Sequence, residues 1–304
     1  MNVQNPSASR GIVIQAVDLV KNYGTGSNMV HALRGVNVSF ERGKFTAIMG
    51  PSGSGKSTLM HTLAGLDSAT SGHILFGGAD LTRMDDKQLT LLRRHKIGFI
   101  FQSFNLLPMF TAEQNILMPL TLAGDKPDRA WFDLLVETLG LKQRLNHRPN
   151  ELSGGQQQRV AIARALITKP KLVFADEPTG NLDSVSSAEV LGFLKRSVNE
   201  LGQTIVMVTH DAVAASYADR AIVFADGQIV ADEANPTAET MNDLLMAERE
   251  RATRAAVTST RADTLARLAG VKDVPNLPIT DAPLPPAGRT GTMHHARAAA
   301  QHAR

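Results

Sequence analysis

The chain has 304 residues, of which 43% are hydrophobic and 20% are charged, a balance typical of a folded protein rather than of a wholly disordered one. It contains no cysteine, which excludes disulfides, thiolate metal sites and a cysteine nucleophile. The net charge is +3, but residues 251–304 hold eight Lys and Arg against three Asp, so the preceding residues carry a small negative charge. The overall basicity therefore says little about nucleic-acid binding.

Five segments rich in apolar residues predict strands. The first two contain alternating apolar residues, whereas the other three are short apolar runs that suit buried strands. They cover residues 11–20, 36–40, 45–49, 172–175 and 204–208. Helical patterns precede or follow each of them, so the sequence predicts an α/β fold with a mainly parallel sheet. Ligands of such sheets bind beyond the carboxyl ends of the strands, where the motifs below lie.

The C-terminal part of the chain has a different composition. Every aromatic residue lies at or before Phe224, and beyond about residue 236 the chain is rich in Ala, Arg, Thr and Pro. Such a segment buries too little apolar surface to offset the entropy of ordering it. We therefore expect one domain over 11–236 and a mostly disordered tail over 237–304, which starts with a short amphipathic helix near Met241. The positive charge of the tail leaves contact with anionic lipid or an acidic partner open.

Membrane insertion is not expected. No apolar run reaches the roughly 18 residues that a spanning helix needs. The first ten residues also lack the apolar stretch of a signal peptide. We expect a cytoplasmic protein that reaches a membrane only by docking onto a membrane protein.

Residues 50–58 read GPSGSGKST and match the phosphate-binding pattern G-x-x-x-x-G-K-[ST] between a predicted strand and a helix. Glycines let the backbone turn its N–H groups towards an anion, and the following helix directs its positive end to the same place. Lys56 is expected to reach the β- and γ-phosphates of a nucleotide, and Ser57 to coordinate Mg²⁺. The candidate binding residues are Gly50, Pro51, Ser52, Gly53, Ser54, Gly55, Lys56, Ser57 and Thr58. The alternative is a glycine-rich turn without a ligand, which the strand–loop–helix context disfavours.

Two carboxylates follow the predicted strand 172–175. Asp176 is placed to hold the Mg²⁺ shell, as in the second acidic motif of P-loop NTPases. Glu177 is placed to orient and polarise an attacking water, where position matters more than its pKa. The alternative is an acidic turn before a helix that Asp183 or Ser184 caps.

His210 follows the last predicted strand. Its ring is placed to contact a γ-phosphate or to hold Glu177 and the attacking water. A single histidine at a strand end is more often structural, but the motifs at the other strand ends favour a functional role.

A second glycine loop, LSGGQ at residues 152–156, precedes a helical pattern whose apolar face includes Val160 and Ala163. Ser153 and Gln156 fit a capping box, which is the purely structural interpretation. The two glycines between them also leave the N–H groups of a helix N-terminus open to an anion. A single nucleotide that needs both glycine loops could take them from two different subunits.

These motifs together resemble the ATP-binding subunits of ABC transporters over about residues 11–235. LSGGQ followed by QQQRVAIARAL is the most specific feature, and its combination with the phosphate loop, the acidic strand and His210 is decisive. The resemblance implies a P-loop NTPase (RecA-like) fold with an antiparallel β subdomain and an inserted α-helical subdomain over about 103–165. It also implies a head-to-tail homodimer in which ATP lies between the phosphate loop of one protomer and residues 153–156 of the other.

The same resemblance implies roles for single residues. Tyr23 would stack on adenine, and Gln102 would contact Mg²⁺ or water and link hydrolysis to the helical subdomain. The implied catalytic residues are Glu177, His210 and Gln102, and the implied metal ligands are Ser57, Gln102 and Asp176. The signature residues that would bind ATP from the partner are Ser153, Gly154, Gly155 and Gln156, and residues 181–183 would cross the dimer interface.

Residues 93–94, 98–108 and 175–184 are similar to those of the lipoprotein-release and macrolide-export group. This implies an ATP-hydrolysing subunit on the inner face of the cell membrane, coupled to a separate permease for export or extraction of a substrate. The alternative is a regulatory ABC ATPase that drives a cell-envelope complex without transport. A soluble ABC-type ATPase acting on nucleic acid is disfavoured by the single phosphate loop and the lack of a long heptad run, so no nucleic-acid partner is expected.

Overall fold

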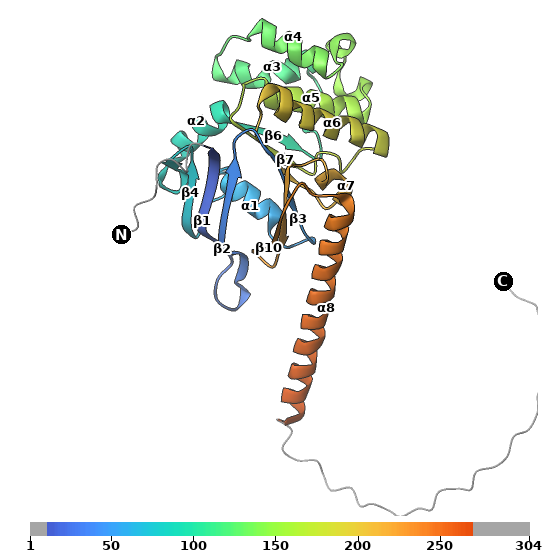
Figure 1. Cartoon of the computed structure of the whole chain (residues 1–304). Coiled ribbons are helices and arrows are strands. Elements are labelled where there is room, and N and C mark those ends of the chain that lie inside the picture. Colours follow the sequence, from blue (N-terminus) through green and yellow to red (C-terminus); the bar gives the residue numbers. More distant parts are fainter. Residues whose placement is uncertain (1–10, 270–304) are drawn as a thin grey trace, which may run out of the picture. The chain divides into compact units, whose positions relative to one another are not determined.

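The computed structural model describes residues 11–269, which contain two β-sheets and eight α-helices (Figure 1). A four-stranded antiparallel sheet has the order β2-β1-β4-β5. Its strands are β1 (Ile12–Tyr23), β2 (Val30–Glu41), β4 (Ser71–Phe76) and β5 (Ala79–Asp80). This sheet is the antiparallel β part that the family resemblance implies.

The second sheet has six strands in the order β10-β9-β3-β8-β7-β6. All its neighbouring pairs are parallel except β9 and β10. Its strands are β3 (Phe45–Met49), β6 (Ile97–Phe101), β7 (Leu172–Asp176), β8 (Ile205–Val208), β9 (Arg220–Ala225) and β10 (Gln228–Ala234). The predicted α/β fold with a mainly parallel sheet is confirmed.

Several helices begin at a residue whose side chain caps them. Asp85, Thr111 and Ser153 each form a capping box with a glutamine three residues later, which satisfies N–H groups at the helix start. The α-helices are α1 (Lys56–Leu63), α2 (Asp86–Lys96), α3 (Ala112–Ala123), α4 (Arg129–Thr138), α5 (Gly154–Leu166), α6 (Ser184–Leu201), α7 (Ala212–Ala215) and α8 (Ala238–Ala269). Short 3₁₀ turns are η2 (Gly26–Asn28), η3 (Leu81–Arg83), η4 (Lys142–Arg144) and η5 (Pro149–Glu151). Figure 1 shows α3, α4 and α5 gathered beyond β6 and β7, and these helices lie largely within the expected helical region.

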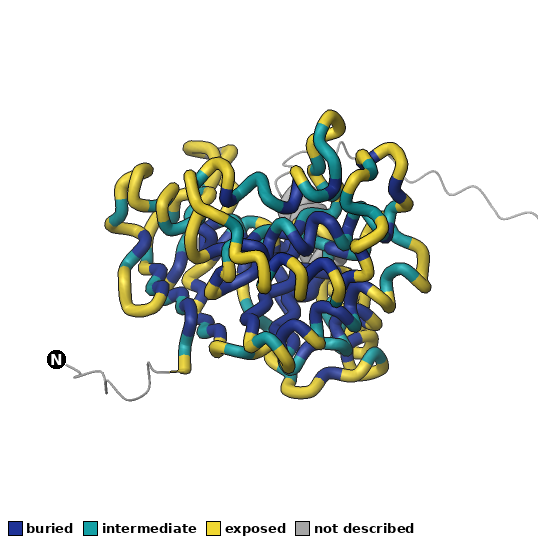
Figure 2. Tube along the Cα trace, turned by 90° about the horizontal axis from the view of Figure 1, so that it is seen from above, coloured by how far each residue is buried: buried dark blue, intermediate teal, exposed yellow. Residues whose placement is uncertain are grey.

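Two hydrophobic cores lie on either side of the six-stranded sheet. One contains α1 and residues of both sheets, including Phe40, Leu59 and Phe174. The other joins the sheet to α3, α4, α5 and α6. Figure 2 shows these buried residues concentrated in the interior and the exposed ones at the turns. The cores hold α1 and the strand ends in fixed positions, which is what a site at those ends requires.

The segment after residue 236 differs from its expected form. Residues 238–269 form α8, which is longer than the short helix that the sequence suggested. The first turns of α8 pack against the core, and Met241 in these turns is fully buried. The compact unit continues to Arg254. A second unit begins at Ala255. The mostly disordered tail was expected over 237–304, and of this range residues 270–304 lie outside the described part of the chain.

A membrane-spanning helix was not expected. Within residues 11–269, no helix is both long enough and apolar enough to cross a bilayer.

Candidate nucleotide-binding site

A cleft of about 970 Å³ lies at the phosphate loop. It brings together residues that are distant in sequence, among them Tyr23, Lys56, Glu177 and His210. The other lining residues are Met29, Val30, His31, Ala32, Arg34, Ser52, Gly53, Ser54, Gly55, Ser57, Thr58, Asp226 and Gly227. Most of the residues that the sequence assigned to nucleotide binding in one protomer therefore face a single cavity.

The phosphate loop connects the fully buried strand β3 to α1. Its three glycines Gly50, Gly53 and Gly55 have φ values of 147°, 79° and 104°, a region that favours glycine. A Cβ at Gly50 would lie 1.9 Å from the carbonyl oxygen of Phe224, so no side chain fits there. The glycines therefore allow the backbone conformation of the loop, and Gly50 lets the loop pack closely against β9.

Lys56 begins α1 and is only 8% exposed. Its Nζ donates to the carbonyl oxygen of Pro51 at 2.7 Å, which holds the ammonium group inside the loop. Burial lowers the pKa of Lys56, while the negative charges of Glu177 and Asp176 oppose that shift. An ammonium group kept from water in this way is suited to binding a phosphate oxygen.

Asp176 ends β7 and lies beside the phosphate loop. Burial raises the pKa of Asp176, and the charge of Glu177 adds to this, while His61 and Lys56 act in the opposite direction. A cation at this carboxylate would offset that cost. Ser57, Gln102 and Asp176 each offer an oxygen ligand, the type that Mg²⁺ prefers, so these residue types fit the ion, although only Ser57 of the three lines the cleft.

Glu177 has a φ of 45°, which is uncommon for a residue with a side chain. Its amide donates to the carbonyl oxygen of Val208 at 2.9 Å, and its carbonyl accepts from Gly180 at 3.0 Å. Backbone strain of this kind clusters at functional sites. It directs the Glu177 side chain into the cleft instead of along the strand.

His210 and Glu177 lie against each other. Nδ1 of His210 is 2.9 Å from Oε1 of Glu177, and a carboxylate oxygen only accepts, so the ring nitrogen donates. The histidine side chain is 68% exposed, and its ring lies at the open side of the cleft. The structure therefore places His210 against Glu177, and the contact of His210 with a γ-phosphate stays a prediction.

Gln102 follows β6, and it is not among the described residues that line the cleft. Its Nε2 donates to Oδ1 of Asn181 at 3.3 Å, and the amide of Asn181 donates back to the carbonyl oxygen of Gln102 at 3.1 Å. The side chain crosses Gly180 so closely that a Cβ there would lie 2.7 Å from Nε2. Gln102 is thus joined to the loop that follows Glu177.

The signature residues lie away from the cleft of their own protomer. Ser153 accepts from the amide of Gln156, and the glutamine side chain accepts from the amide of Ser153, as the capping box predicts. Gly155 faces Ser186, since a Cβ there would lie 3.0 Å from its hydroxyl. Gly154 likewise faces Leu182 at 3.4 Å. Asp183 caps α6, so the structural interpretation of that residue holds as well.

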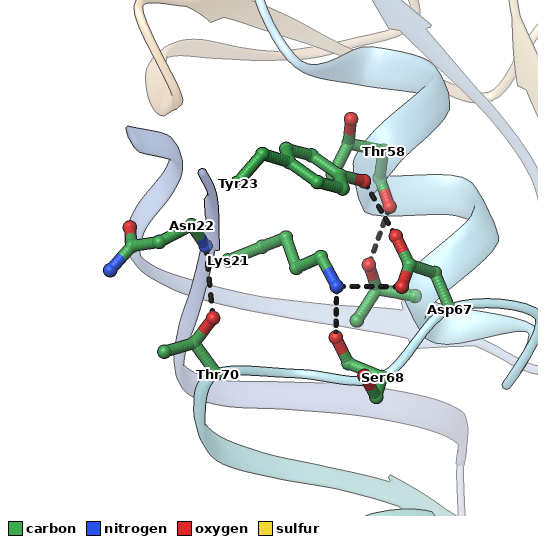
Figure 3. Close-up of polar contacts among 8 residues, drawn as sticks. Lys21, Asn22, Tyr23, Thr58, Asp67, Ser68 and Thr70 are labelled. Carbon is green, nitrogen blue, oxygen red and sulfur yellow. Dashed lines mark hydrogen bonds and ion pairs between the residues drawn. The ribbon is translucent and has the colours of Figure 1, made fainter. Parts of the chain in front are cut away.

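Sequence reasoning did not identify two groups near the site. Asp67 accepts a hydrogen bond from the hydroxyl of Tyr23 and also pairs with Lys21 (Figure 3). Gln158 of α5 donates to the carbonyl oxygen of Pro178 at 2.6 Å, next to Glu177. The only signal in the sequence was that Lys21 and Gln158 occupy positions where the strand and helix patterns predict buried residues. A buried polar residue needs a hydrogen-bond partner, but the sequence pattern does not identify which residue that partner is.

The fold and the cleft define a P-loop nucleotide hydrolase. Residues 33–180 match the family model described as ABC transporter. The chain is 49% identical over 222 residues to the lipoprotein-releasing system ATP-binding protein LolD of Geobacter metallireducens, covering 72% of this chain and 99% of that protein. It belongs to the ABC transporter family and is an ATP-binding, ATP-hydrolysing subunit.

Two further comparisons agree. The macrolide export ATP-binding/permease protein MacB of Syntrophobacter fumaroxidans is 49% identical over 221 residues, which are 71% of this chain but only 31% of that longer protein. A solved dimeric ATP-binding cassette in a post-hydrolysis state, bound to ADP and Pi, is 40% identical, covers 73% of this chain and 98% of its own, and has a TM-score of 0.66. These similarities match the lipoprotein-release and macrolide-export group.

Proposed function

We propose that this subunit works as a head-to-tail homodimer that powers a separate membrane permease. One observation carries the dimer: the cleft contains the phosphate loop, Glu177 and His210, whereas residues 153–156 lie outside it. Ser153 caps α5, and the N–H groups at that helix start are suited to an anion brought by a second protomer. A similar solved cassette is described as dimeric and bound to ADP and Pi.

The residues of the cleft support hydrolysis of the terminal phosphate. Backbone N–H groups of residues 53–57 and the Lys56 ammonium bind the phosphate chain, and Tyr23 provides a wall for the base. Ser57, Asp176 and Gln102 would hold Mg²⁺, which neutralises phosphate charge when it is bound.

Glu177 accepts a hydrogen bond from the attacking water, and His210 holds that carboxylate in place. The water oxygen forms a bond to the γ-phosphorus while the bond to the ADP oxygen breaks. Catalysis in this arrangement depends on position, because the strained backbone and the histidine fix where the carboxylate oxygen lies.

A groove between α2, β6, α3 and α5 is the proposed docking site of the permease. Its volume is about 520 Å³, and it is lined by apolar groups such as Phe99, Phe101 and Leu122 together with arginines. Leu122 is 70% exposed and adds to the apolar lining of this groove, and apolar surface of this kind is suited to a protein partner. Phe101 directly precedes Gln102, so a partner in this groove would act next to the residue that is joined to the catalytic loop.

Docking there would place the subunit in the cytoplasm, peripheral on the inner face of the membrane. The relatives named above belong to release and export systems, which supports export or extraction of a substrate over a purely regulatory role. The substrate itself is handled by the permease.

Replacing Glu177 by Gln tests the catalytic and dimer proposals together. We expect kcat to fall by about 100-fold or more, because the amide no longer orients water as the carboxylate does. We also expect ATP to hold the variant as a dimer in size-exclusion chromatography. Glu113→Gln, on α3, is the matched control and should hydrolyse ATP normally.

Normal turnover by Glu177→Gln would overturn the role of Glu177, and a monomer under every nucleotide condition would overturn the dimer. For the permease, Leu122→Asp should keep basal hydrolysis but lose stimulation by a membrane subunit that co-purifies with the unaltered chain. Failure of the unaltered chain to co-purify with any such subunit would count against the partner.

A further inference from the structure

The hydroxyl of Tyr23 is hydrogen-bonded to one member of a partly buried ion pair (Figure 3). It donates to Oδ2 of Asp67 at 2.5 Å. The other carboxylate oxygen of Asp67 accepts from Nζ of Lys21 at 2.6 Å, and the same ammonium group donates to the carbonyl oxygen of Ser68 at 2.7 Å. The tyrosine ring is therefore held at its far end, in addition to its backbone position at the end of β1.

Lys21 contributes a second restraint on the ring. Its side chain is 9% exposed, and its Nζ lies 4.8 Å from the ring centroid of Tyr23, within the range of a cation–π interaction. Tyr23 is nevertheless 42% exposed and lines the cleft beside the phosphate loop. The ring thus has one restrained side and an accessible surface towards the nucleotide site.

Asp67 connects this ring to the phosphate-binding helix. It follows the C-terminal end of α1, where its amide donates to the carbonyl oxygen of His61 at 3.3 Å. The N-terminal end of the same helix begins at Lys56 in the phosphate loop. The wall for a base and the site for the phosphates are therefore attached to opposite ends of one short helix, which keeps their separation constant.

The protonation states of Tyr23 and Asp67 favour the hydrogen bond between them. Burial and the hydrogen bond to Asp67 raise the pKa of Tyr23, so its hydroxyl remains a donor at neutral pH. Burial raises the pKa of Asp67, but the hydrogen bonds from Lys21 and Tyr23 outweigh this and hold it below its usual value. The carboxylate therefore remains an acceptor.

We propose that Asp67, held by Lys21, is a positioning residue that locks the Tyr23 ring in the orientation in which a purine base stacks on it. This rests on the proposed binding of ATP in the cleft. A half-exposed tyrosine without this hydrogen bond exchanges between rotamers, and binding must then restrict it. The pair acts on affinity for the nucleoside part of ATP and not on the chemical step, which takes place at the other end of α1.

Steady-state hydrolysis by the full chain tests this. For Asp67→Ala we expect KM for ATP to rise about 3- to 10-fold while kcat stays within about twofold, as for loss of one charged hydrogen bond and one restrained side chain. Tyr23→Phe keeps the ring and removes the donor, so it should reproduce the rise. The double variant should add nothing further, because both changes break one interaction.

Two controls separate positioning from a structural effect. Inorganic tripolyphosphate, as a competitive inhibitor, uses only the phosphate loop, so its inhibition constant should be unchanged in Asp67→Ala. Asp128→Ala is the matched variant: Asp128 pairs with Lys169 at 2.7 Å, and Nζ of Lys169 lies 5.4 Å from the ring centroid of Trp131, but this cluster does not line the cleft. It should leave KM unchanged.

Each remaining outcome is informative. An unchanged KM for ATP in Asp67→Ala would overturn the proposal. A rise in the inhibition constant of tripolyphosphate as large as the rise in KM would also overturn it, because the carboxylate would then act through the fold of α1. If Tyr23→Ala binds ATP as tightly as the unaltered chain, the stacking role of Tyr23 is wrong. If the unaltered chain does not bind ATP at all, the proposed function itself fails.

Discussion

Two charged groups at the nucleotide-binding site are buried at a cost to the stability of the nucleotide-free protein. Asp176 is partly buried beside Glu177, and Lys56 is almost fully buried. Burial raises the pKa of Asp176 and lowers that of Lys56, so in each case the charged form is disfavoured in the fold. Such sites sacrifice stability for ligand binding.

Replacing Asp176 by Asn should therefore stabilise the nucleotide-free protein at neutral pH. A carboxyl whose folded pKa is raised contributes stability below its unfolded pKa, and this contribution is lost as pH rises through the folded value. At pH 7.5 we expect the variant to melt about 1–4 °C higher, and the difference to shrink as pH falls towards 4.5. Thermal melting at the two pH values measures this.

Asp219 is the matched control with the opposite sign. Burial raises its pKa, but hydrogen bonds from Lys195 and the amide of Phe45 outweigh this and lower it. Its contribution to stability is present above the unfolded pKa and is lost as pH falls through the folded value. Asp219→Asn should therefore lower the melting temperature at pH 7.5. A lower melting temperature of Asp176→Asn at that pH would contradict the prediction.

At the scale of elements, α5 links the signature loop to the catalytic loop. Gln158 is fully buried, and its Nε2 donates to the carbonyl oxygen of Pro178 at 2.6 Å and approaches that of Phe101 at 3.5 Å. Pro178 follows Glu177, and Phe101 precedes Gln102. One side chain thus joins a helix to the ends of β6 and β7, which supports the unusual backbone conformation at Glu177.

Gln158→Met should reduce hydrolysis through this link. The side chain keeps its length but cannot donate, so the buried carbonyl of Pro178 loses its partner, at a cost of ~1–3 kcal/mol. We expect kcat to fall about 3- to 10-fold because the carboxylate of Glu177 is held less tightly. Enzyme kinetics and urea unfolding measure the two effects.

Gln157→Met is the matched control. Gln157 is the neighbouring residue of α5, and its side chain donates to the carbonyl oxygen of Leu152 instead of to that of Pro178. Equal losses of kcat in both variants would show that the position of α5, and not the bond to Pro178, is responsible.

At the scale of the whole chain, α8 contributes to the stability of the nucleotide-binding unit. Met241 has no exposed surface, and Leu244 and Leu245 pack against the same core. The sequence placed the end of the domain near residue 236, because composition changes there, but composition does not report that a few apolar residues beyond it cover the core.

Truncation should reveal this. A chain ending at residue 254 keeps the buried Met241 and should unfold at the same urea concentration as the full chain. A chain ending at residue 236 exposes the core and should lose ~2–5 kcal/mol, the usual cost of deleting a buried methionine side chain. Met241→Ala in the full chain should show a loss of similar size. Equal stability of the two truncated chains would mean that α8 does not support the core.

The sequence by itself determined the parts of this protein that depend on local pattern. The buried strand 45–49 followed by a loop and a helix is correctly predicted, and the capping box at Ser153 is present as the structural interpretation of that loop proposed, because each depends on neighbouring residues and on backbone geometry. The α/β fold follows from the order of such segments.

Only the tertiary structure decided which side chains meet. Tyr23 and Asp67 are 44 residues apart, and Glu177 and His210 are 33 residues apart. A β-bulge region between Ala16 and Leu19 shifts the register of β1 before Lys21, whose buried position brings its ammonium group to Asp67. Contacts of this kind depend on how strands and helices pack, and neither periodicity nor composition specifies them.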